Sequence, residues 1–585
     1  MYILGVSFDY HDSAAALICG EKVLAAAHED RFSRVKGDSS FPKRAIDFCL
    51  QQAGIKSNEL DFVVYYENPL KKFERIVKTS IRSLPKGAHY LKETVQDWIA
   101  SGKFEPRERI HSYLKIDSSK VIYGNHHRSH AASAFFCSPF EEAAIVTLDG
   151  VGESETATIN VGKANSIEKI GAVEFPHSLG LFYSAFTAYA GFQVNEGEYK
   201  LMGMAAFAEP SYLQKMRSFF RLCPDGRFRV DQRPFKFMTS DEMPFNPYLE
   251  QLFGCCRPPE STFDPRGGKT TESQEARRHA GIAASVQKVT EEVVLHVVRQ
   301  AMRRTGLKNV CLAGGVALNC VANSRIVSEL GCQLYVHPDA GDAGAALGAA
   351  LAYYYLDLKQ QRKIAPLNDP YLGLSVDEKI VKKAFEVAFL KPDEHYEDEQ
   401  KLVTDIAKRL AEGQVVGWMQ GRAEWGPRAL GNRSILANPT RTDMQKIVNE
   451  KIKYREPFRP FAPSVLKDRA SEFFELGDIN DAGPEHFMLS VVKVRESAKA
   501  KIPAVTHIDG TARVHLVDKN TNPLFYSLIQ QFGVITGIPV LLNTSFNLRG
   551  EPVVNSPEDA IKTFQWSNMD CLVIGRYLIN SENNV

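Results

Sequence analysis

The sequence lacks an excess of charge of either sign. Its 585 residues hold 71 Lys and Arg against 70 Asp and Glu, so the formal net charge is +1. A protein that tracks nucleic-acid phosphates over a broad surface needs a basic excess, so nucleic acid is not favoured as a partner. Hydrophobic residues make up 44% and charged residues 24%, as in soluble globular proteins, and the length calls for two or more domains.

Paired cysteines, a leader peptide and a membrane span are also not expected. The 10 Cys are scattered without a CxxC pair, and a chain of this size does not need disulfides. We therefore expect the protein to be located in the reducing cytoplasm. The N-terminal stretch MYILGVSFDYHDS has no basic region and reaches acids at Asp9 and Asp12, which is unlike a signal peptide. The uncharged run Ala343–Leu356 is too short to span a bilayer.

Two segments share a strand–turn–strand plan. The first is YILGVSFDYHDSAAALIC with EKVLAAAHEDR, and the second covers residues 141–162. A third segment, residues 309–330, runs from a strand through a Gly-Gly turn into a helix. This pattern favours a duplicated α/β domain that grips a nucleotide between its halves, because small residues let backbone N–H groups approach phosphate. Two ordinary β-hairpins in an α/β protein would produce the same pattern, so both interpretations stay open here.

Composition divides the chain into two predicted domains. Residues 359–375 are polar, contain two prolines and are typical of a linker, which leaves domains of 1–358 and 376–585. Within the first domain, the irregular stretch 209–275 is rich in Pro, Asp, Arg and Phe. We interpret it as an insertion, which either shapes an acceptor pocket or is a structural embellishment. Residues 68–118 raise the same question.

The stretch NHHRSHAASAFF, residues 125–136, is a candidate metal site. On a helix, His126 and His130 project from one face with Cβ atoms about 5–6 Å apart, which suits two ligands on one ion. The following strand ends in LDG at Asp149, a candidate third ligand, and Asp342 in GDAG is a candidate fourth. Two His and two carboxylates leave open positions and favour Fe(II), Mn or Zn. The alternative is a pair of hydrogen-bonded histidines at the start of a buried helix.

Two weaker motifs suit a nucleotide or a charged ligand. The turn AGGVALN offers Gly314 and Gly315 for close backbone approach and Asn319 for a base or ribose, although many α/β turns look alike. The stretch NEGEYKLMGMA places Glu198 and Lys200 between apolar flanks, as in a loop that holds a charged ligand or in a plain solvated turn.

The first turn and the loop after it add polar candidates. His11 is a candidate acid, base or positioning group, although a lone His beside Asp more often has a structural role. The loop His28–Pro42 holds Arg31, Arg34 and Lys36.

The second half concentrates basic residues in loops beside Gly, Pro or small polar residues. These are Arg422, Arg428, Arg433, Lys453, Arg455, Arg459, Arg513 and Arg549. Arginine forks and a lysine can hold several phosphate or carboxylate oxygens, and Ser545 and Asn547 add further hydrogen-bonding groups. Surface arginines paired with acids would explain any one of these residues but explain the set poorly, because few acids lie in the same loops.

Taken in order, the motifs resemble the NodU/CmcH-type O-carbamoyltransferases from end to end. They are HDSAAAL, RFSRVKGDSSFP, HHRSHAASAFF, LDGVGE, FPHSLGLFYSAFT, GEYKLMGMA, LAGGVALNC, GDAGAALGAA, QGRAEWGPRALGNRSIL, REPFRPFAP, THIDGTARV and NTSFNLRGEPVV. The resemblance implies an α/β protein with an N-terminal actin-like (ASKHA, Kae1-type) domain and a C-terminal YrdC-like α/β domain. It further implies that the C-terminal domain joins carbamoyl phosphate and ATP into carbamoyl adenylate. The N-terminal domain then transfers the carbamoyl group to an acceptor hydroxyl at an iron-type metal site.

The same resemblance assigns roles in the first domain. The metal ligands become His126, His130, Asp149 and Asp342. His11 and Lys36 become groups that meet the adenylate and the acceptor. The nucleotide is lined by Gly314, Gly315 and Asn319, with Glu198 and Lys200 nearby.

In the second domain, a K-x-R…S-x-N pattern carries the assignment. It is formed by Lys453, Arg455, Ser545 and Asn547. Arg422 and Arg513 are expected to complete the anion cradle. Lys453, Arg455 and Ser545 are the expected catalytic groups here, as His11 and Lys36 are in the first domain.

The preferred hypothesis is therefore an ATP-dependent O-carbamoyltransferase acting on a natural product or sugar-like alcohol. It needs Fe(II) or another divalent metal, carbamoyl phosphate and ATP, with Mg²⁺ left open as a companion of ATP. One alternative is a tRNA threonylcarbamoyl transferase, which the balanced charge disfavours. Another is an actin-like sugar kinase or nucleotide-binding regulator. That activity would not explain the HHRSH stretch or the many loop arginines of the second half. The sequence does not name the acceptor, the native metal or the assembly, and a homodimer is left open.

Overall fold

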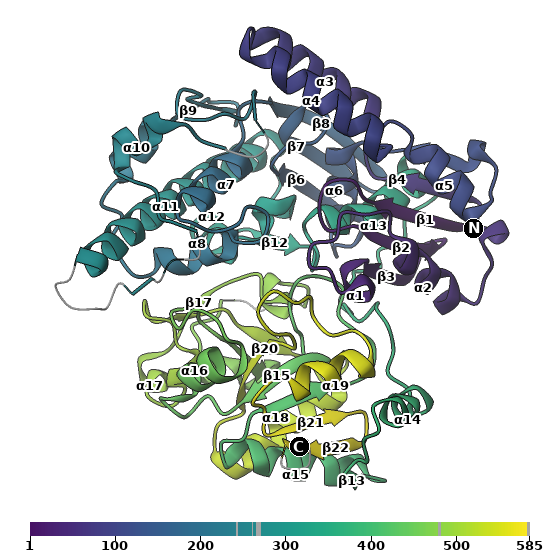
Figure 1. The fold of residues 1–585 in the computed structure, drawn as a ribbon, viewed down its shortest axis with the longest axis vertical. Helices are drawn as coiled ribbons and strands as arrows, with labels where there is room; N and C mark the ends of the chain where they lie inside the picture. The colour runs from purple at the N-terminus through teal and green to yellow at the C-terminus, as the bar shows by residue number, and fades with distance from the viewer. Residues whose placement is uncertain (241–243, 260, 262, 265–270, 478–480, 582–585) are drawn as a thin grey trace. The chain divides into compact units, whose positions relative to one another are not determined.

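The computed structural model describes residues 1–240, 244–259, 261, 263–264, 271–477 and 481–581. The chain folds into two compact units (Figure 1). Unit 1 comprises Met1–Glu29 and Gly37–Pro366, and unit 2 comprises Asp30–Lys36 and Leu367–Val585. The division after Pro366 lies within the predicted linker, whereas the assignment of Asp30–Lys36 to unit 2 has no counterpart in the sequence patterns.

The first sheet of unit 1 has the strand order β3-β2-β1-β4-β5. Its strands are β1 (Tyr2–Ser7), β2 (Ala14–Cys19), β3 (Lys22–His28), β4 (Phe62–Tyr65) and β5 (Val121–Tyr123). The first three strands form an antiparallel meander, and β4 and β5 then add parallel to β1. Strand β2, AAALIC, is buried along nearly its whole length, as expected for a strand covered on both faces.

The second sheet of unit 1 repeats this plan in the order β12-β11-β6-β7-β8. Its strands are β6 (Glu142–Leu148), β7 (Glu155–Lys163), β8 (Ser166–Glu174), β11 (Asn309–Ala313) and β12 (Gln333–Val336). Again three antiparallel strands are followed by two parallel ones. The repeated order confirms the predicted duplicated, actin-like α/β unit, and shows that the two hairpins belong to one duplicated design.

Two helices lie between the sheets of unit 1 (Figure 1). Helix α6 (His126–Phe136) packs on β6 and β11, and helix α13 (Asp342–Ala352) packs on β1, β2 and α6. The approach of α13 is close enough to exclude side chains. A Cβ atom on Gly348 would lie 1.9 Å from the carbonyl oxygen of Ser129 in α6, and one on Gly5 in β1 would lie 1.8 Å from that of Ala346. Helix α13 therefore packs against α6 and β1 through backbone atoms, and a larger residue at Gly348 or Gly5 would push these elements apart.

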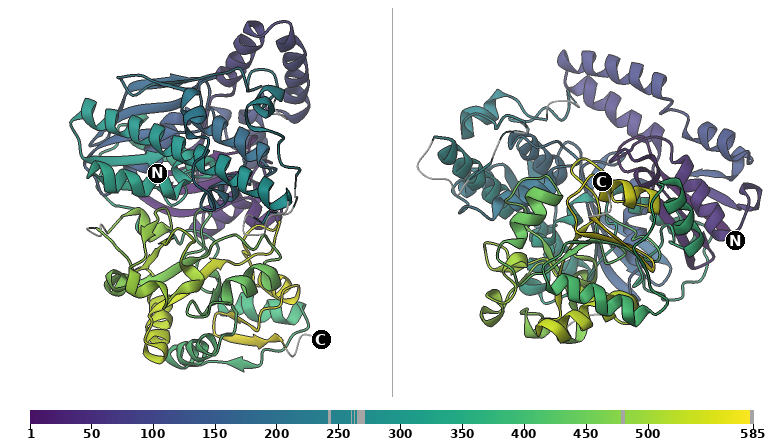
Figure 2. Two further views of the ribbon diagram at one scale, coloured as in Figure 1. Left: turned by 90° about the vertical axis from the view of Figure 1, so that its left-hand side faces the viewer. Right: turned by 60° about the horizontal axis from the view of Figure 1, so that its bottom comes forward.

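Other elements of unit 1 surround this centre. Helices α3 (Pro69–Arg82) and α4 (Lys86–Ser101) form a hairpin at the edge of the unit and lead to α5 (Pro106–Leu114) (Figures 1 and 2). Further helices are α2 (Lys43–Ala53), α7 (Leu179–Tyr189), α8 (Glu198–Ala205), α9 (Leu213–Ser218), α10 (Pro247–Phe253), α11 (Thr271–Thr305) and α12 (Cys320–Leu330). In the predicted insertion 209–275, α9, α10 and the pair β9 (Phe220–Leu222) and β10 (Phe228–Val230) are described. Residues 241–243, 260, 262 and 265–270 of that stretch lie outside the described residues.

Unit 2 is built on an eight-stranded sheet in the order β13-β22-β21-β14-β15-β20-β16-β19. The strands are β13 (Glu394–His395), β14 (Val416–Met419), β15 (Arg433–Ala437), β16 (Ala462–Leu466), β19 (His515–Val517), β20 (Val540–Ser545), β21 (Cys571–Ile574) and β22 (Tyr577–Asn580). A separate pair joins β17 (Val492–Lys493) to β18 (Thr511–Ala512).

Helices cover both faces of the large sheet. In β14, Trp418 joins an apolar core with helices α15 (Glu399–Ala411) and α18 (Pro523–Thr536), and its neighbour Met419 joins a second core with α14 (Glu378–Val387) and α19 (Pro557–Gln565). This alternation is the period-2 pattern of a strand buried on both faces. Short helices α1 (Asp30–Ser33), α16 (Met444–Lys446) and α17 (Glu496–Lys499) complete the assigned α-helices. Among the described residues, no helix combines the length and the apolar character that a membrane crossing requires.

We predict that Gly348→Ala lowers the free energy of unfolding by about 3 kcal/mol, the upper end of the usual cost of overpacking. The added methyl group would meet backbone atoms, which cannot rotate away as a side chain can. Urea denaturation measures the effect. The matched control is Gly477→Ala, where a Cβ has no atom within 4 Å, and it should change stability by less than about 0.5 kcal/mol. Equal stability of the two variants would contradict the backbone contact.

Candidate metal centre and anion site

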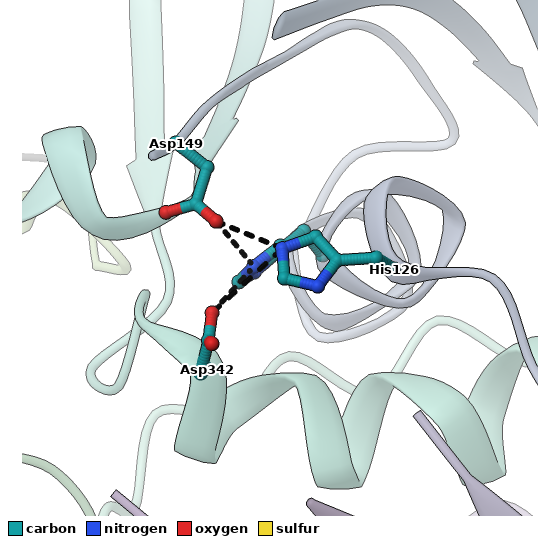
Figure 3. Close-up of side chains that lie close together, drawn as sticks. His126, Asp149 and Asp342 are labelled. Carbon is teal, nitrogen blue, oxygen red and sulfur yellow. Dashed lines mark hydrogen bonds and ion pairs between the residues drawn. The ribbon is translucent and has the colours of Figure 1, made fainter. Parts of the chain in front are cut away.

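Four buried side chains of unit 1 converge on one point (Figure 3). His126 and His130 project from α6 one turn apart, Asp149 follows the end of β6, and Asp342 is the first residue of α13. One ligand atom from each residue lies within 4.8 Å of the others. The structure thus brings together all four sequence-predicted metal ligands, from three elements.

The distances suit a divalent cation. His126 Nε2 lies 2.8 Å from Asp149 Oδ2, and His130 Nε2 lies 3.3 Å from Asp342 Oδ1. The two crossed His–Asp pairs are each 3.8 Å apart. Ligands about 2.1 Å from an ion lie about 3 Å apart when adjacent and about 4.2 Å apart when opposite. The 3.3 and 3.8 Å separations fall within that range, and the 2.8 Å pair is at hydrogen-bonding distance. Two imidazole nitrogens and two carboxylate oxygens form a donor set typical of first-row transition metals.

Negative charge dominates this cluster. Burial alone would lower the pKa of His126, but the carboxylates of Asp342 and Asp149 outweigh it and raise that pKa well above its ordinary value. Burial raises the pKa of Asp149, yet the hydrogen bond from His126 and the nearby positive charge of His130 and His126 bring it well below its ordinary value. The carboxylates therefore favour the protonated form of the histidines, and a bound cation would be stabilised by the same negative charges.

The Gly-Gly turn supports Asp149. The backbone N–H of Gly315 donates to Asp149 Oδ1 at 2.8 Å, leaving Oδ2 toward the histidines. Gly314 has φ +91°, and a Cβ there would lie 2.3 Å from the carbonyl oxygen of Leu148, so only glycine fits. The backbone amide of Gly315 is therefore hydrogen-bonded to the Asp149 carboxylate. Contact of the turn with a nucleotide stays a prediction.

The remaining nucleotide candidates have local partners. Asn319 caps α12 by accepting from the backbone N–H of Ala322, and it exchanges amide hydrogen bonds of 3.0 Å with Gln287. Glu198 starts α8 and accepts from Ser184 Oγ at 2.9 Å and from the backbone N–H of Asn195 at 3.0 Å. Lys200 Nζ lies 5.6 Å from the centre of the Phe192 ring. These contacts hold loops in place and leave the predicted ligand roles as predictions.

His11 lies at the edge of the cluster. Its Nδ1 is 2.8 Å from Asp12 Oδ2, and its Nε2 is 3.9 Å from Asp342 Oδ2. Burial would lower its pKa, but the hydrogen bond and charge of Asp12, with those of Asp342 and Asp149, raise it to about 9. His11 is therefore next to the candidate metal ligands, and with this pKa it is protonated at neutral pH.

His127 has a structural role. Its Nδ1 lies 2.7 Å from Thr147 Oγ1 in β6, and its Nε2 lies 2.9 Å from the carbonyl oxygen of Glu155 in β7. Burial lowers the pKa of His127 to about 3, so the ring is neutral. The middle histidine of the motif fixes α6 to the sheet, while its neighbours face the cluster.

The turn that carries His11 is held by an ion pair absent from the sequence predictions. Arg109 Nη1, from α5, lies 2.7 Å from both carboxylate oxygens of Asp9. Asp9 has φ +75°, a strained conformation for a residue other than glycine. The guanidinium also lies 4.8 Å from the centre of the Phe8 ring. Helix α5 thus stabilises the bend that places His11.

We predict that Arg109→Ala destabilises unit 1 by about 1–3 kcal/mol at pH 8 and by less at pH 5. Burial already raises the pKa of Asp9, and removing the guanidinium raises it further above the unfolded value. A raised folded-state pKa means that stability is lost as the pH rises through it. Urea denaturation at both pH values tests this. Arg107→Ala, on the same helix, removes an exposed guanidinium that stacks on Tyr123. The free energy of unfolding of this control should differ little from that of the parent, and the difference should be the same at both pH values.

The second cluster, in unit 2, centres on buried Lys453. Its Nζ donates to the carbonyl oxygens of Ser545 and Asn547 at 2.7 Å each and to Asn547 Oδ1 at 2.6 Å. Ser545 Oγ in turn donates to Asn547 Oδ1 at 2.7 Å. Burial lowers the pKa of Lys453 well below its ordinary value, and the cations of Arg455 and Arg459 act in the same direction. An anion placed here would stabilise the charged lysine.

The other predicted anion-binding residues divide into two groups. Arg455 lies near Lys453, with its Nε donating to Asn449 Oδ1 at 2.7 Å and its guanidinium 4.7 Å from the Phe461 ring centre. Arg513 follows β18 and lies near His507, whose pKa is lowered to about 4 by burial first and further by the charge of Arg513. Arg422 instead donates to the carbonyl oxygens of Leu372 and Gly373, which fastens the chain that enters unit 2.

Lys36 belongs to unit 2 by its contacts, whereas His11 belongs to unit 1. Two arginines fix its segment there. Arg31 donates to the carbonyl oxygen of Gly426, and Arg34 donates to those of Pro552 and Val553 and pairs with Asp559. Lys36 contributes to the positive field at Lys453. The structure therefore places Lys36 with the anion-binding candidates of unit 2. Contact of Lys36 with the adenylate or the acceptor stays a prediction.

Sequence reasoning missed several residues that support the metal centre. Glu153 accepts from the backbone N–H of His126 at 3.0 Å and from that of Asn68 at 3.0 Å. Glu67 lies behind His126, and Lys72 binds Glu67 at 2.8 Å. Glu153 ends the motif LDGVGE but has no predicted role, and Glu67 and Lys72 stand in none of the quoted motifs. Position offered a hint for Glu67, which lies two residues after the apolar strand β4, much as Asp149 follows β6.

Comparison with known proteins gives a consistent result. Residues 2–351 match the family described as carbamoyltransferase N-terminus, and residues 407–581 match carbamoyltransferase C-terminus. An uncharacterised Synechocystis protein, sll1178, is 41% identical over 99% of this chain and 96% of its own length. Nodulation protein NolNO of Sinorhizobium fredii is 36% identical, over 97% of this chain and 79% of the relative. Nodulation protein NolO of Bradyrhizobium diazoefficiens is 38% identical, over 78% of each chain.

Proposed function

The chain belongs to the carbamoyltransferase family, and from this premise we propose that it is an ATP-dependent O-carbamoyltransferase. In this proposal, unit 2 forms carbamoyl adenylate from carbamoyl phosphate and ATP. Unit 1 then transfers the carbamoyl group to a hydroxyl of a small-molecule natural product or sugar. Unit 2 is accordingly the YrdC-like, adenylate-forming part and unit 1 the transferring part.

The observation that supports this proposal best is the presence of two buried clusters of opposite character. Unit 2 gathers cations around Lys453, and unit 1 gathers carboxylates around His126 and His130. A cationic cluster suits the exchange of phosphoanhydrides, because negative charge increases where the new bond forms. A His and Asp cluster suits a divalent cation that activates an acyl group. The activity of a simple sugar kinase would give no role to the His and Asp cluster of unit 1.

In unit 2, the proposed chemistry has two balanced steps. Water attacks carbamoyl phosphate, giving carbamate and inorganic phosphate. A carbamate oxygen then attacks the α-phosphorus of ATP, the bond to the β-phosphate bridge breaks, and pyrophosphate leaves. Lys453 and Arg455 neutralise the phosphoryl oxygens, while Ser545 and Asn547 hold the lysine in position.

In unit 1, the acceptor oxygen attacks the carbonyl carbon of carbamoyl adenylate, and the bond from that carbon to the AMP oxygen breaks. His11 accepts the acceptor proton. Fe(II) or another divalent cation, held by His126, His130, Asp149 and Asp342, would supply Lewis acidity and positive charge for the AMP phosphate. Compensation of Asp149 and Asp342 would remove two of the charges that raise the pKa of His11 to about 9. His11 would then be a better proton acceptor near neutral pH.

We predict that Lys453→Ala abolishes carbamoyl phosphate-dependent exchange of labelled pyrophosphate into ATP, with a loss of at least about 100-fold. The exchange needs no acceptor, so it reports unit 2 alone. Lys446→Ala, an exposed lysine on α16, is the matched control and should retain the exchange. Exchange that survives in Lys453→Ala would contradict the role of Lys453, and exchange that is absent from the parent protein would contradict the adenylate step.

We predict that His130→Ala retains the pyrophosphate exchange but loses carbamoyl transfer, because His130 belongs to unit 1. Transfer is measured as a carbamate mass gain on candidate alcohols, compared with His89→Ala, which replaces an exposed histidine of α4. Equal loss of exchange and transfer in His130→Ala would refute the division into two sites.

A further inference from the structure

Glu67 is a buried carboxylate with no place in the chemistry described so far. It follows β4 and Tyr66 in unit 1, and its side chain is 3% exposed. Its Oε2 lies 3.6 Å from His126 Nδ1. Within the part of the chain that the structure describes, neither of these two atoms has a conventional hydrogen-bond partner. Two buried polar atoms therefore face each other at slightly more than hydrogen-bonding distance.

Lys72 accounts for the placement of Glu67. Its Nζ, from α3, lies 2.8 Å from Glu67 Oε1, and its side chain is only 14% exposed. One carboxylate oxygen is thus bound by the lysine, which leaves the other toward His126. Helix α3 is preceded by its N-cap Asn68, whose side chain accepts from the backbone N–H groups of Leu70 and Lys71 and whose backbone N–H donates to Glu153. The position of the carboxylate is set from outside the metal centre.

The two ring nitrogens of His126 face different groups. Nε2 faces Asp149 and Asp342, and Nδ1 faces Glu67. An imidazole that binds a metal must be neutral and offers one nitrogen, so its proton lies on the other nitrogen. A carboxylate next to Nδ1 holds the proton there, fixes the plane of the ring and makes Nε2 a better donor. His130 provides a contrast, since its buried Nδ1 has no comparable partner among the described residues.

We propose that Glu67, held by Lys72, is a positioning residue that fixes His126 in its Nδ1–H tautomer and so presents Nε2 to the metal. The inference rests on the proposed function, because it assumes that the four-residue cluster binds a divalent cation. It assigns to α3, within the unexplained segment 68–118, a role in supporting the site.

Metal binding itself provides the test. Metal-free, full-length protein is titrated with Co²⁺, and affinity is followed by calorimetry and by the visible absorption of the bound ion. Glu67→Gln, which keeps the size of the side chain but removes its charge, should bind Co²⁺ about 10–100-fold more weakly and shift the spectrum. Glu67→Asp keeps the charge and should recover part of the affinity. A role in packing alone would not produce this recovery, because Asp is smaller than Gln.

Two further variants separate the effect from general damage. Lys72→Met leaves the carboxylate present but unheld, and should weaken Co²⁺ binding in the same direction by a smaller factor. It also provides a second test if Glu67→Gln fails to fold. Glu74→Gln, an exposed carboxylate of α3 that pairs with Lys78, is the matched control and should bind Co²⁺ as the parent does.

The outcomes distinguish this inference from the proposed function. Parent-like affinity and spectrum in Glu67→Gln overturn the positioning role while the metal centre stands. Affinity in Glu67→Asp no better than in Glu67→Gln also overturns it. A parent protein that binds no Co²⁺ overturns the metal centre and the positioning role together.

Discussion

Helix α13 touches helix α6 through backbone atoms at Gly348, and much of unit 1 follows from that contact. A close approach of two helices fixes both their separation and their register, because there is no side chain to adjust. Asp342 begins α13 and His130 lies on α6, so the contact sets how far apart these two residues lie. The strand end at Asp149 and the turn at Gly315 complete the cluster from the neighbouring sheet. The geometry of the candidate metal centre therefore depends on this backbone contact between α6 and α13.

Charge is divided between the two units in a way that the total hides. The chain as a whole carries a net charge of +1, yet one unit buries carboxylates around imidazoles and the other buries a lysine among arginines. In the proposed function, the carboxylates of unit 1 would hold a cation and the cations of unit 2 would hold phosphate. Ligands carrying both, such as a nucleotide with its metal, are suited to a protein built in this manner.

The local features of the site could be predicted from the sequence, and the long-range ones could not. The helix at residues 126–136 and the strand end at Asp149 follow from short patterns of apolar and polar residues. The pairing of Asp9 with Arg109 joins residues 100 positions apart, and no local propensity encodes it. The loop arginines show the same limit. Arg455 lies in the cationic cluster, while Arg422 and Arg433 donate to backbone carbonyls, although all three stand in similar sequence surroundings.

The seven residues Asp30–Lys36 affect how the protein can be divided. The chain leaves unit 1, contributes this segment to unit 2 and returns, before it finally crosses at Pro366. Three covalent connections therefore join the units, and cutting the chain near residue 366 leaves two of them intact. A shortened protein that begins at Leu367 would also lack Arg34, which binds the carbonyl oxygens of Pro552 and Val553. The second unit is thus continuous in space but not in sequence, and part of its structure comes from a segment that lies between two parts of the first unit in the sequence.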